Sequence, residues 1–152
     1  MLLTDLLTID RIKIPLTSRT KDEVLHELVN IVANGGEEPQ RRELLRAVRE
    51  REAVLSTGIG NGVAIPHGKS SVVPELRMAV GSAHEPVDFD ALDGQPVQLV
   101  FLLVGPESAA GPHIKALSRI ARLIRNDDVR KALLAAKSPQ EFLDALRKAE
   151  HL

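Results

Sequence analysis

Hydrophobic residues follow two different spacings along this chain, and segments of the two kinds are interleaved. Where apolar residues recur three and four positions apart, the spacing predicts helices. The predicted helices run from a cap at Ser18 or Thr20 to Gly35-Gly36, from Gln40 to Arg51, from about His113 to Arg125, from Asn126 to Ala136, and onward from Ser138. A short leucine stripe at residues 2–7 predicts one or two further helical turns.

Short apolar or alternating segments predict strands. These lie at Arg11–Leu16, Val63–Pro66, Leu76–His84 and Val97–Val104. The last is nearly all apolar, so we expect a central strand that is covered on both faces. The turn around Asp93-Gly94 is short enough for a hairpin, which predicts at least one antiparallel pair. The sequence therefore predicts an α/β fold, with a mixed β-sheet covered on both faces by helices, as a single domain over residues 1–152.

Composition narrows the possible partners. The 152 residues carry a net charge of −1 and only 2% aromatic residues, which gives no case for binding nucleic acid or a membrane surface. There is no cysteine, which excludes a disulfide framework and a thiolate zinc site. The N-terminus has no basic segment of a signal peptide, and no apolar run approaches the ~20 residues of a membrane helix. We therefore expect a cytoplasmic protein without membrane insertion.

The stretch Arg51–Lys69 stands out because it combines three glycines, a short strand and a Pro-His-Gly tripeptide. Pro66 and Gly68 flank His67, and neither favours continuation of a regular strand. We therefore expect the imidazole of His67 at the edge of a sheet. Glycines nearby allow backbone N–H groups to approach an anion. The stretch lacks the Gly-Lys-Ser/Thr of a nucleotide-binding P-loop.

Other candidate residues have an ordinary explanation and a functional one. His113 follows Gly111-Pro112 at a predicted helix start, where the helix dipole favours a phosphoryl group, but it also fits a polar residue near a helix end. Arg51 ends an arginine-rich helix, which fits either a solvated basic face or phosphate binding. We interpret His26 as a solvated helix residue, His84 as a packing or turn residue, and His151 as part of the tail. The aspartates at 88, 90 and 93 lack the pattern of a calcium-binding loop.

The run Ser-Thr-Gly-Ile-Gly-Asn-Gly-Val-Ala-Ile-Pro-His-Gly resembles the active-site segment of the enzyme IIA domains of the bacterial phosphotransferase system, mannitol/fructose class. The Gly-Pro-His-Ile-Lys-Ala-Leu segment and an arginine sixteen residues before the active histidine (67 − 51 = 16) also match. The resemblance implies that His67 accepts a phosphoryl group, on Nε2, from an HPr-like phosphocarrier protein. It further implies that His113 and Arg51 stabilise the phosphoryl group, aided by the phosphate-loop residues Ser56, Thr57, Gly58, Gly60 and Gly62. No metal or other cofactor is implied.

Three roles stay open at this point. The loop is most similar to the nitrogen-regulatory branch of the family, which implies a regulator whose target proteins distinguish the phosphorylated from the unphosphorylated state. Because the chain has no cysteine and no membrane span, we expect a free-standing IIA that carries out no later step of sugar transfer itself. A sugar-uptake IIA that serves a separate fructose- or mannitol-type IIB is the first alternative. A non-catalytic interaction module is the second.

Overall fold

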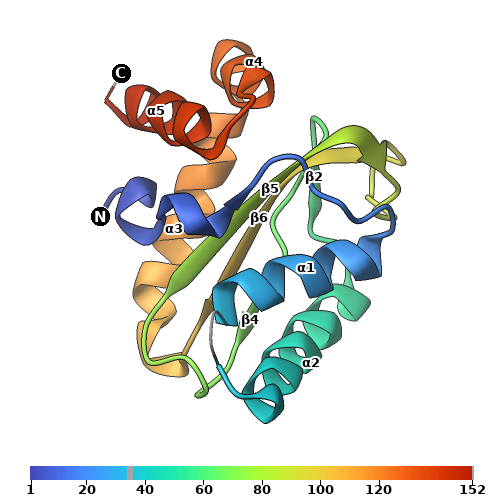
Figure 1. The fold of residues 1–152 in the computed structure, drawn as a ribbon, viewed down its shortest axis with the longest axis vertical. Coiled ribbons are helices and arrows are strands. Elements are labelled where there is room, and N and C mark those ends of the chain that lie inside the picture. The colour runs from blue at the N-terminus through green and yellow to red at the C-terminus, as the bar shows by residue number, and fades with distance from the viewer. Residues whose placement is uncertain (34–35, 152) are drawn as a thin grey trace.

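A mixed six-stranded sheet lies between two groups of helices (Figure 1). The computed structural model describes residues 1–33 and 36–151. The strands follow the order β1-β5-β6-β3-β2, and β4 also pairs with β6. Their bounds are β1 Ile12–Lys13, β2 Gly58–Gly60, β3 Val63–Ala64, β4 His67–Lys69, β5 Arg77–Val87 and β6 Val97–Gly105. The predicted mixed α/β class is confirmed.

The helices form two layers. Helices α1 (Lys21–Ala33) and α2 (Glu38–Val54) cover one face of the sheet, and α3 (Ala110–Ile124), α4 (Asp127–Ala135) and α5 (Pro139–Glu150) lie on the other side. The described residues also form three short 3-10 helices: η1 Leu3–Leu6, η2 Ile9–Arg11 and η3 Glu107–Ala109. No helix within the described residues is both long enough and apolar enough to cross a membrane.

Strand β6 is buried on both faces, as its apolar sequence predicts. Leu99, Phe101 and Leu103 pack into the core beneath α3, α4 and α5. The alternate residues Val100 and Leu102 pack into the core beneath α1 and α2. This alternation follows from the two-residue period of a strand. β5 runs antiparallel to β6, so the expected antiparallel pair around Asp93-Gly94 is also confirmed.

Three predicted helix starts are correct because capping side chains set them. The Thr20 hydroxyl accepts a hydrogen bond from the Glu23 N–H, which selects Thr20 rather than Ser18 as the first cap. Asn126 and Ser138 cap α4 and α5 through their side-chain oxygens. The predicted end of the first helix at Gly35-Gly36 lies partly outside the described residues.

Several predicted boundaries are wrong. β1 is only Ile12–Lys13, and α2 runs from Glu38 to Val54 rather than from Gln40 to Arg51. β5 extends to Val87, beyond the predicted end at His84. α3 begins at Ala110, three residues before His113, because η3 leads directly into it and the Ala110 N–H donates to the Glu107 carbonyl.

The predicted strand at Val63–Pro66 does not end at its proline. Val63 pairs with Leu99, and His67 pairs with Leu103, so β3 and β4 keep one parallel register along β6 (99 − 63 = 36; 103 − 67 = 36). The Pro66 carbonyl accepts from the Leu103 N–H at 3.0 Å and keeps the two parts together. His67 therefore lies within the sheet, which corrects the expectation that the chain turns away there.

Gly68 explains how α2 comes close to this strand. A β-carbon at Gly68 would lie 3.1 Å from the backbone nitrogen of Val48 and 3.2 Å from the carbonyl carbon of Ala47. Such contacts are tighter than most β-carbons make, so glycine lets the α2 backbone lie against β4 without displacement. The consequence is that the C-terminal end of α2, which carries Arg51, is held near His67.

Candidate active site

Two histidines from different elements meet on one side of the sheet. Along β3 and β4, the side chains of Val63, Ile65 and His67 lie on the face that packs against α3, since alternate residues share a face. α3 supplies His113. The ring centroids of His67 and His113 lie 5.5 Å apart, and the ring planes meet edge to face at 71°. The structure therefore brings together the two histidines that the sequence singles out.

His67 has one occupied and one available ring nitrogen. Its Nδ1 lies 2.8 Å from the carbonyl oxygen of Ile65, and a carbonyl accepts only from a protonated nitrogen. This hydrogen bond favours the tautomer with the proton on Nδ1 and leaves the lone pair on Nε2. Burial lowers the pKa of His67, opposed by the hydrogen bond to Ile65 and reinforced by the positive charge of Arg51. Neutral imidazole with a free Nε2 is the nucleophilic form.

His113 is the more buried of the two rings, with 3% of its surface exposed. Neither of its ring nitrogens has a hydrogen-bond partner among the residues that the structure describes. Burial, together with the nearby positive charges of His67 and Lys69, lowers the pKa of His113 to about 4. A buried polar group usually has a partner. The ring of His113 therefore has an N–H free among the described residues, which could donate to a group at His67.

The role expected for the start of α3 needs correction. Because the helix begins at Ala110, His113 lies inside its first turns and not at its end. The N–H groups of Ala109 and Ala110 already donate to the carbonyls of Pro106 and Glu107. His113 can therefore act through its ring, whereas the expected contribution of free helix N–H groups is not supported at these two residues.

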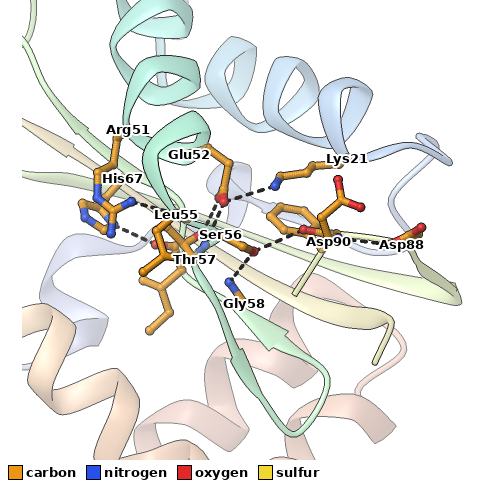
Figure 2. Close-up of polar contacts among 12 residues, drawn as sticks. Lys21, Arg51, Glu52, Leu55, Ser56, Thr57, Gly58, His67, Asp88 and Asp90 are labelled. Atoms are coloured by element: carbon orange, nitrogen blue, oxygen red, sulfur yellow. Dashed lines mark hydrogen bonds and ion pairs between the residues drawn. The ribbon is translucent and has the colours of Figure 1, made fainter. Parts of the chain in front are cut away.

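Arg51 lies in the last turns of α2, beside His67 (Figure 2). Its Nη1 donates to the carbonyl of Leu55 at 2.9 Å, which folds the side chain back over the loop that follows the helix. A surface depression of about 350 Å³ is lined by residues from α2, the following loop, β4 and α3. These include Arg51, Ser56, Thr57 and His67. A guanidinium at this place suits phosphate oxygens.

The glycines of the predicted phosphate loop have structural roles in packing and backbone conformation. Gly58 lies in β2 opposite Ala64, and its missing β-carbon leaves room for Ala91, whose own β-carbon would be 2.7 Å away. Gly60, the last residue of β2, and Gly62, in the turn that leads to β3, take positive φ angles of 93° and 74°. These are left-handed conformations that favour glycine.

Backbone donors of the predicted loop are also occupied. The Thr57 N–H donates to the carboxylate of Glu52 at 2.7 Å. The Gly58 N–H donates to the Ser56 hydroxyl oxygen at 3.1 Å. The expectation that these N–H groups cradle a phosphoryl group is therefore wrong for Thr57 and Gly58 in this conformation. What the loop provides instead is a fixed wall for the depression.

Sequence reasoning missed Glu52. Only 6% of its surface is exposed, and both its carboxylate oxygens are engaged by Thr57. A signal was present: Leu44, Val48 and Glu52 continue one helical face at four-residue intervals, so the apolar face of α2 leads directly to a carboxylate. A charged residue at a core position is a reason to look for a partner.

Comparison with known proteins identifies the family of this chain. Residues 5–149 match the family described as "Phosphoenolpyruvate-dependent sugar phosphotransferase system, EIIA 2". The nitrogen regulatory protein of Bradyrhizobium diazoefficiens is 38% identical over 146 residues, covering 96% of this chain and 95% of that protein. The fructose-specific EIIABC component of Bacillus subtilis is also 38% identical over 96% of this chain, which spans only 23% of that longer protein.

Solved structures show the same fold. Nitrogen regulatory protein IIA-Ntr from Neisseria meningitidis superposes with a TM-score of 0.87 at 31% identity, covering 95% of this chain and 98% of that one. The mannitol enzyme IIA of Escherichia coli, solved in complex with phosphorylated enzyme IIB, has a TM-score of 0.79 at 22% identity, covering 93% and 97%. With matches across almost its whole length, the chain belongs to the EIIA 2 family of the phosphoenolpyruvate-dependent sugar phosphotransferase system.

Proposed function

We propose that this chain is a phosphohistidine carrier that accepts a phosphoryl group on Nε2 of His67. The observation that supports this most directly is the hydrogen bond from Nδ1 of His67 to the Ile65 carbonyl, which leaves Nε2 free beside Arg51 and the unpaired ring of His113. A nucleophile, a cation and a neutral donor thus lie around one position. This is the set that phosphoryl transfer needs.

In the proposed step, the Nε2 lone pair attacks the phosphorus of a phosphohistidine on a donor protein. The new N–P bond forms on His67 as the N–P bond of the donor breaks, and the bonding electrons stay on the donor's ring nitrogen. The proton on Nδ1 of His67 stays in its bond to Ile65. Because phosphorus arrives on an activated nitrogen, the step needs no nucleotide and no metal ion.

Arg51 and His113 stabilise the charge of the transferred group. Arg51 places a positive guanidinium near the equatorial oxygens, and in doing so exchanges some of its contact with the Leu55 carbonyl. His113 gives the neutral N–H that its burial preserves. Preorganised groups of this kind act in a partly desolvated site without a large cost of reorganisation at the moment of reaction.

The donor is a protein of the HPr-like phosphocarrier class, and the surface around His67 fits a protein partner. Three large hydrophobic side chains near the site are exposed: Leu55 by 51%, Ile59 by 46% and Ile114 by 65%. Ile59 lines the depression itself, and Ile114 follows His113. Exposed apolar residues beside a shallow polar centre are typical of a protein–protein interface.

The test is acceptance of labelled phosphate from a phosphorylated HPr-like carrier. The wild-type chain should take up label that is lost in acid and kept in base, as expected for phosphohistidine. His67→Ala should take up none, while His84→Ala, which changes an exposed histidine on β5, should behave as wild type. Label of equal amount on the His67→Ala chain would remove His67 as the acceptor. Folded wild-type chain that never accepts label would favour the interaction-module alternative.

We further propose that the phosphorylated and unphosphorylated forms have a regulatory role. The first support is the amino-acid sequence of the Thr57–Gly62 loop. The second is a relative of matching length that is named nitrogen regulatory protein. A dianion on His67 would reverse the local charge made by Arg51 and Lys69, so a partner can distinguish the two forms. Relatives named as fructose-specific components support the uptake alternative. Offering the phosphorylated chain to purified sugar-specific IIB domains separates the two, because rapid and complete transfer to one IIB would contradict the regulatory role.

A further inference from the structure

A buried ionic contact lies behind the candidate site, where neither the nucleophile nor the phosphoryl group would touch it. The carboxylate of Glu52 lies 3.2 Å from the ammonium of Lys21, and 4% and 19% of these two side chains are exposed. Lys21 begins α1, so this pair joins the start of one helix to the last turns of the other (Figure 2). Burial of a carboxylate costs free energy unless it has polar partners, and Thr57 supplies two hydrogen bonds in addition to Lys21.

From Glu52, a continuous chain of hydrogen bonds leads to the nucleophile. Glu52 accepts from the N–H of Thr57 at 2.7 Å and from its hydroxyl at 2.5 Å. The carbonyl of Thr57 accepts from the N–H of Ile65 at 3.0 Å. The carbonyl of Ile65 in turn accepts from Nδ1 of His67 at 2.8 Å. Each bond fixes the peptide group on which the next one depends.

A second branch leads to the cation of the site. The Leu55 carbonyl that receives Nη1 of Arg51 belongs to the same loop, two residues before Thr57. Glu52 and Arg51 are consecutive residues of α2, so their side chains diverge by about 100° around the helix axis. Arg51 thereby lines the surface depression while Glu52 points inward to hold the loop.

We propose that Glu52 is a positioning residue for phosphoryl transfer: anchored by Lys21, it sets the tautomer and orientation of His67 through Thr57 and Ile65, and the place of Arg51 through Leu55. The inference rests on the function proposed above, but the geometry that it describes exists without a phosphoryl donor. Glu52 itself touches neither the donor nor the transferred group. Its effect is to hold two groups in the relation that the reaction requires.

The alternative is that Glu52 serves stability alone. In that case its removal would lower the free energy of unfolding while the folded fraction kept the ring of His67 in its native tautomer. Two readouts separate the alternatives: the ¹⁵N chemical shifts of the His67 ring, which report the tautomer, and the separate measurement of kcat and KM for transfer from a phosphorylated HPr-like carrier.

The experiment compares Glu52→Ala and Glu52→Gln with wild type, and uses Glu50→Ala as the matched control on the same helix. Glu50 is exposed and pairs with Arg46, away from the loop. We expect Glu52→Ala to mix the two neutral tautomers of His67 and to lower kcat by roughly 10- to 100-fold with a much smaller change in KM, because misplacement of reacting groups affects the chemical step. Glu52→Gln keeps an oxygen that can accept from Thr57, so it should fall between Glu52→Ala and wild type. Glu50→Ala should match wild type.

Wild-type tautomer populations in folded Glu52→Ala protein would overturn the inference, as would an unchanged kcat. If Glu52→Ala does not fold, Thr57→Val removes only the hydroxyl donor of the contact, and it should shift both readouts in the same direction by a smaller amount. An unaltered Thr57→Val protein would then overturn the inference. A wild-type chain that accepts no phosphate would instead refute the proposed function, and the tautomer measurement would still test the role of Glu52.

Discussion

Substitution of His113 by glutamine should remove a large part of the pH dependence of folding stability. The pKa of His113 is lowered from 6.5 to about 4 in the folded chain, first by burial and then by the charges of His67 and Lys69. The folded state therefore binds a proton at this residue less readily than the unfolded state. As the pH falls below about 6.5, the unfolded chain gains this proton and the folded chain does not, so stability falls until the pH reaches the folded pKa near 4.

The size of the effect follows from the two pKa values. Between pH 7.5 and pH 5, His113 should cost about 2 kcal/mol of unfolding free energy, since each pKa unit corresponds to about 1.36 kcal/mol. This window lies above the region in which carboxylates with lowered pKa values, such as Asp22 and Glu27, lose their contribution. The lowered pKa of His67 acts in the same direction, so the wild-type slope should exceed the part due to His113.

The assay is urea denaturation at several pH values from 5 to 7.5, for wild type, His113→Gln and the control His84→Gln. His84 is an exposed histidine on β5 and serves as the matched control for replacing a histidine with glutamine. His113→Gln should flatten the slope by about 2 kcal/mol over this range. Parallel curves for His113→Gln and wild type would refute the argument that a buried, neutral imidazole is held at this position.

Three further substitutions test the site and the packing around it. Arg51→Gln should lower the transfer rate by on the order of 10²–10³. It should also raise the pKa of His67 in an NMR titration, because the guanidinium charge lowers that pKa. An unchanged rate and pKa would place Arg51 outside the site. Gly68→Ala should destabilise the fold by roughly 1–3 kcal/mol in urea denaturation, since its β-carbon would lie 3.1 Å from the Val48 nitrogen; wild-type stability would contradict the close packing of α2. Gly60→Val should cost about 1–3 kcal/mol because φ is 93° there, and a normal urea midpoint would show that the turn adapts.

The parts of the fold that the sequence predicts well depend on neighbours along the chain. The apolar run of β6 predicts a strand buried on both faces, and the structure confirms it. Asn126 and Ser138 act as caps because a side-chain oxygen needs only the N–H groups two or three residues onward. Such signals are local, so no knowledge of the tertiary structure is needed to interpret them.

The wrong or incomplete predictions concern contacts between distant segments. Pro-His-Gly favours a strand end when only neighbours are considered, yet pairing with β6 carries the strand through to Lys69. Gly68 is explained by the backbone of α2, twenty residues earlier, and Gly58 by Ala91. The chemistry of the loop glycines allows phosphate binding, but packing accounts for Gly58, and turn geometry accounts for Gly60 and Gly62. These reasons depend on the tertiary structure, so the motif alone does not reveal them.

The position of the site follows from an incomplete edge of the sheet. Among the described residues, β4 pairs with β6 alone, while β2 pairs with β3, so the outer edge of β4 has no strand beside it. His67 can therefore lie within a sheet and still reach the surface. Residues from both helical layers line the depression at this edge: Arg51 comes from α2, and Leu117 comes from α3.

This edge also explains which structural element contributes each of the residues around His67. The register with β6 fixes the backbone of the nucleophile, and the Ile65 carbonyl fixes its ring. α3 packs on the face that carries His67 and places there the proposed neutral donor His113, whose pKa is lowered by burial. α2 lies in the opposite helical layer and places the proposed cation, Arg51, at the surface depression. A charged group in the buried position and a neutral one at the rim would be the less stable arrangement, because desolvation penalises the charged form. This difference in burial fits the proposed roles, with a histidine as the buried neutral donor and an arginine as the more exposed cation.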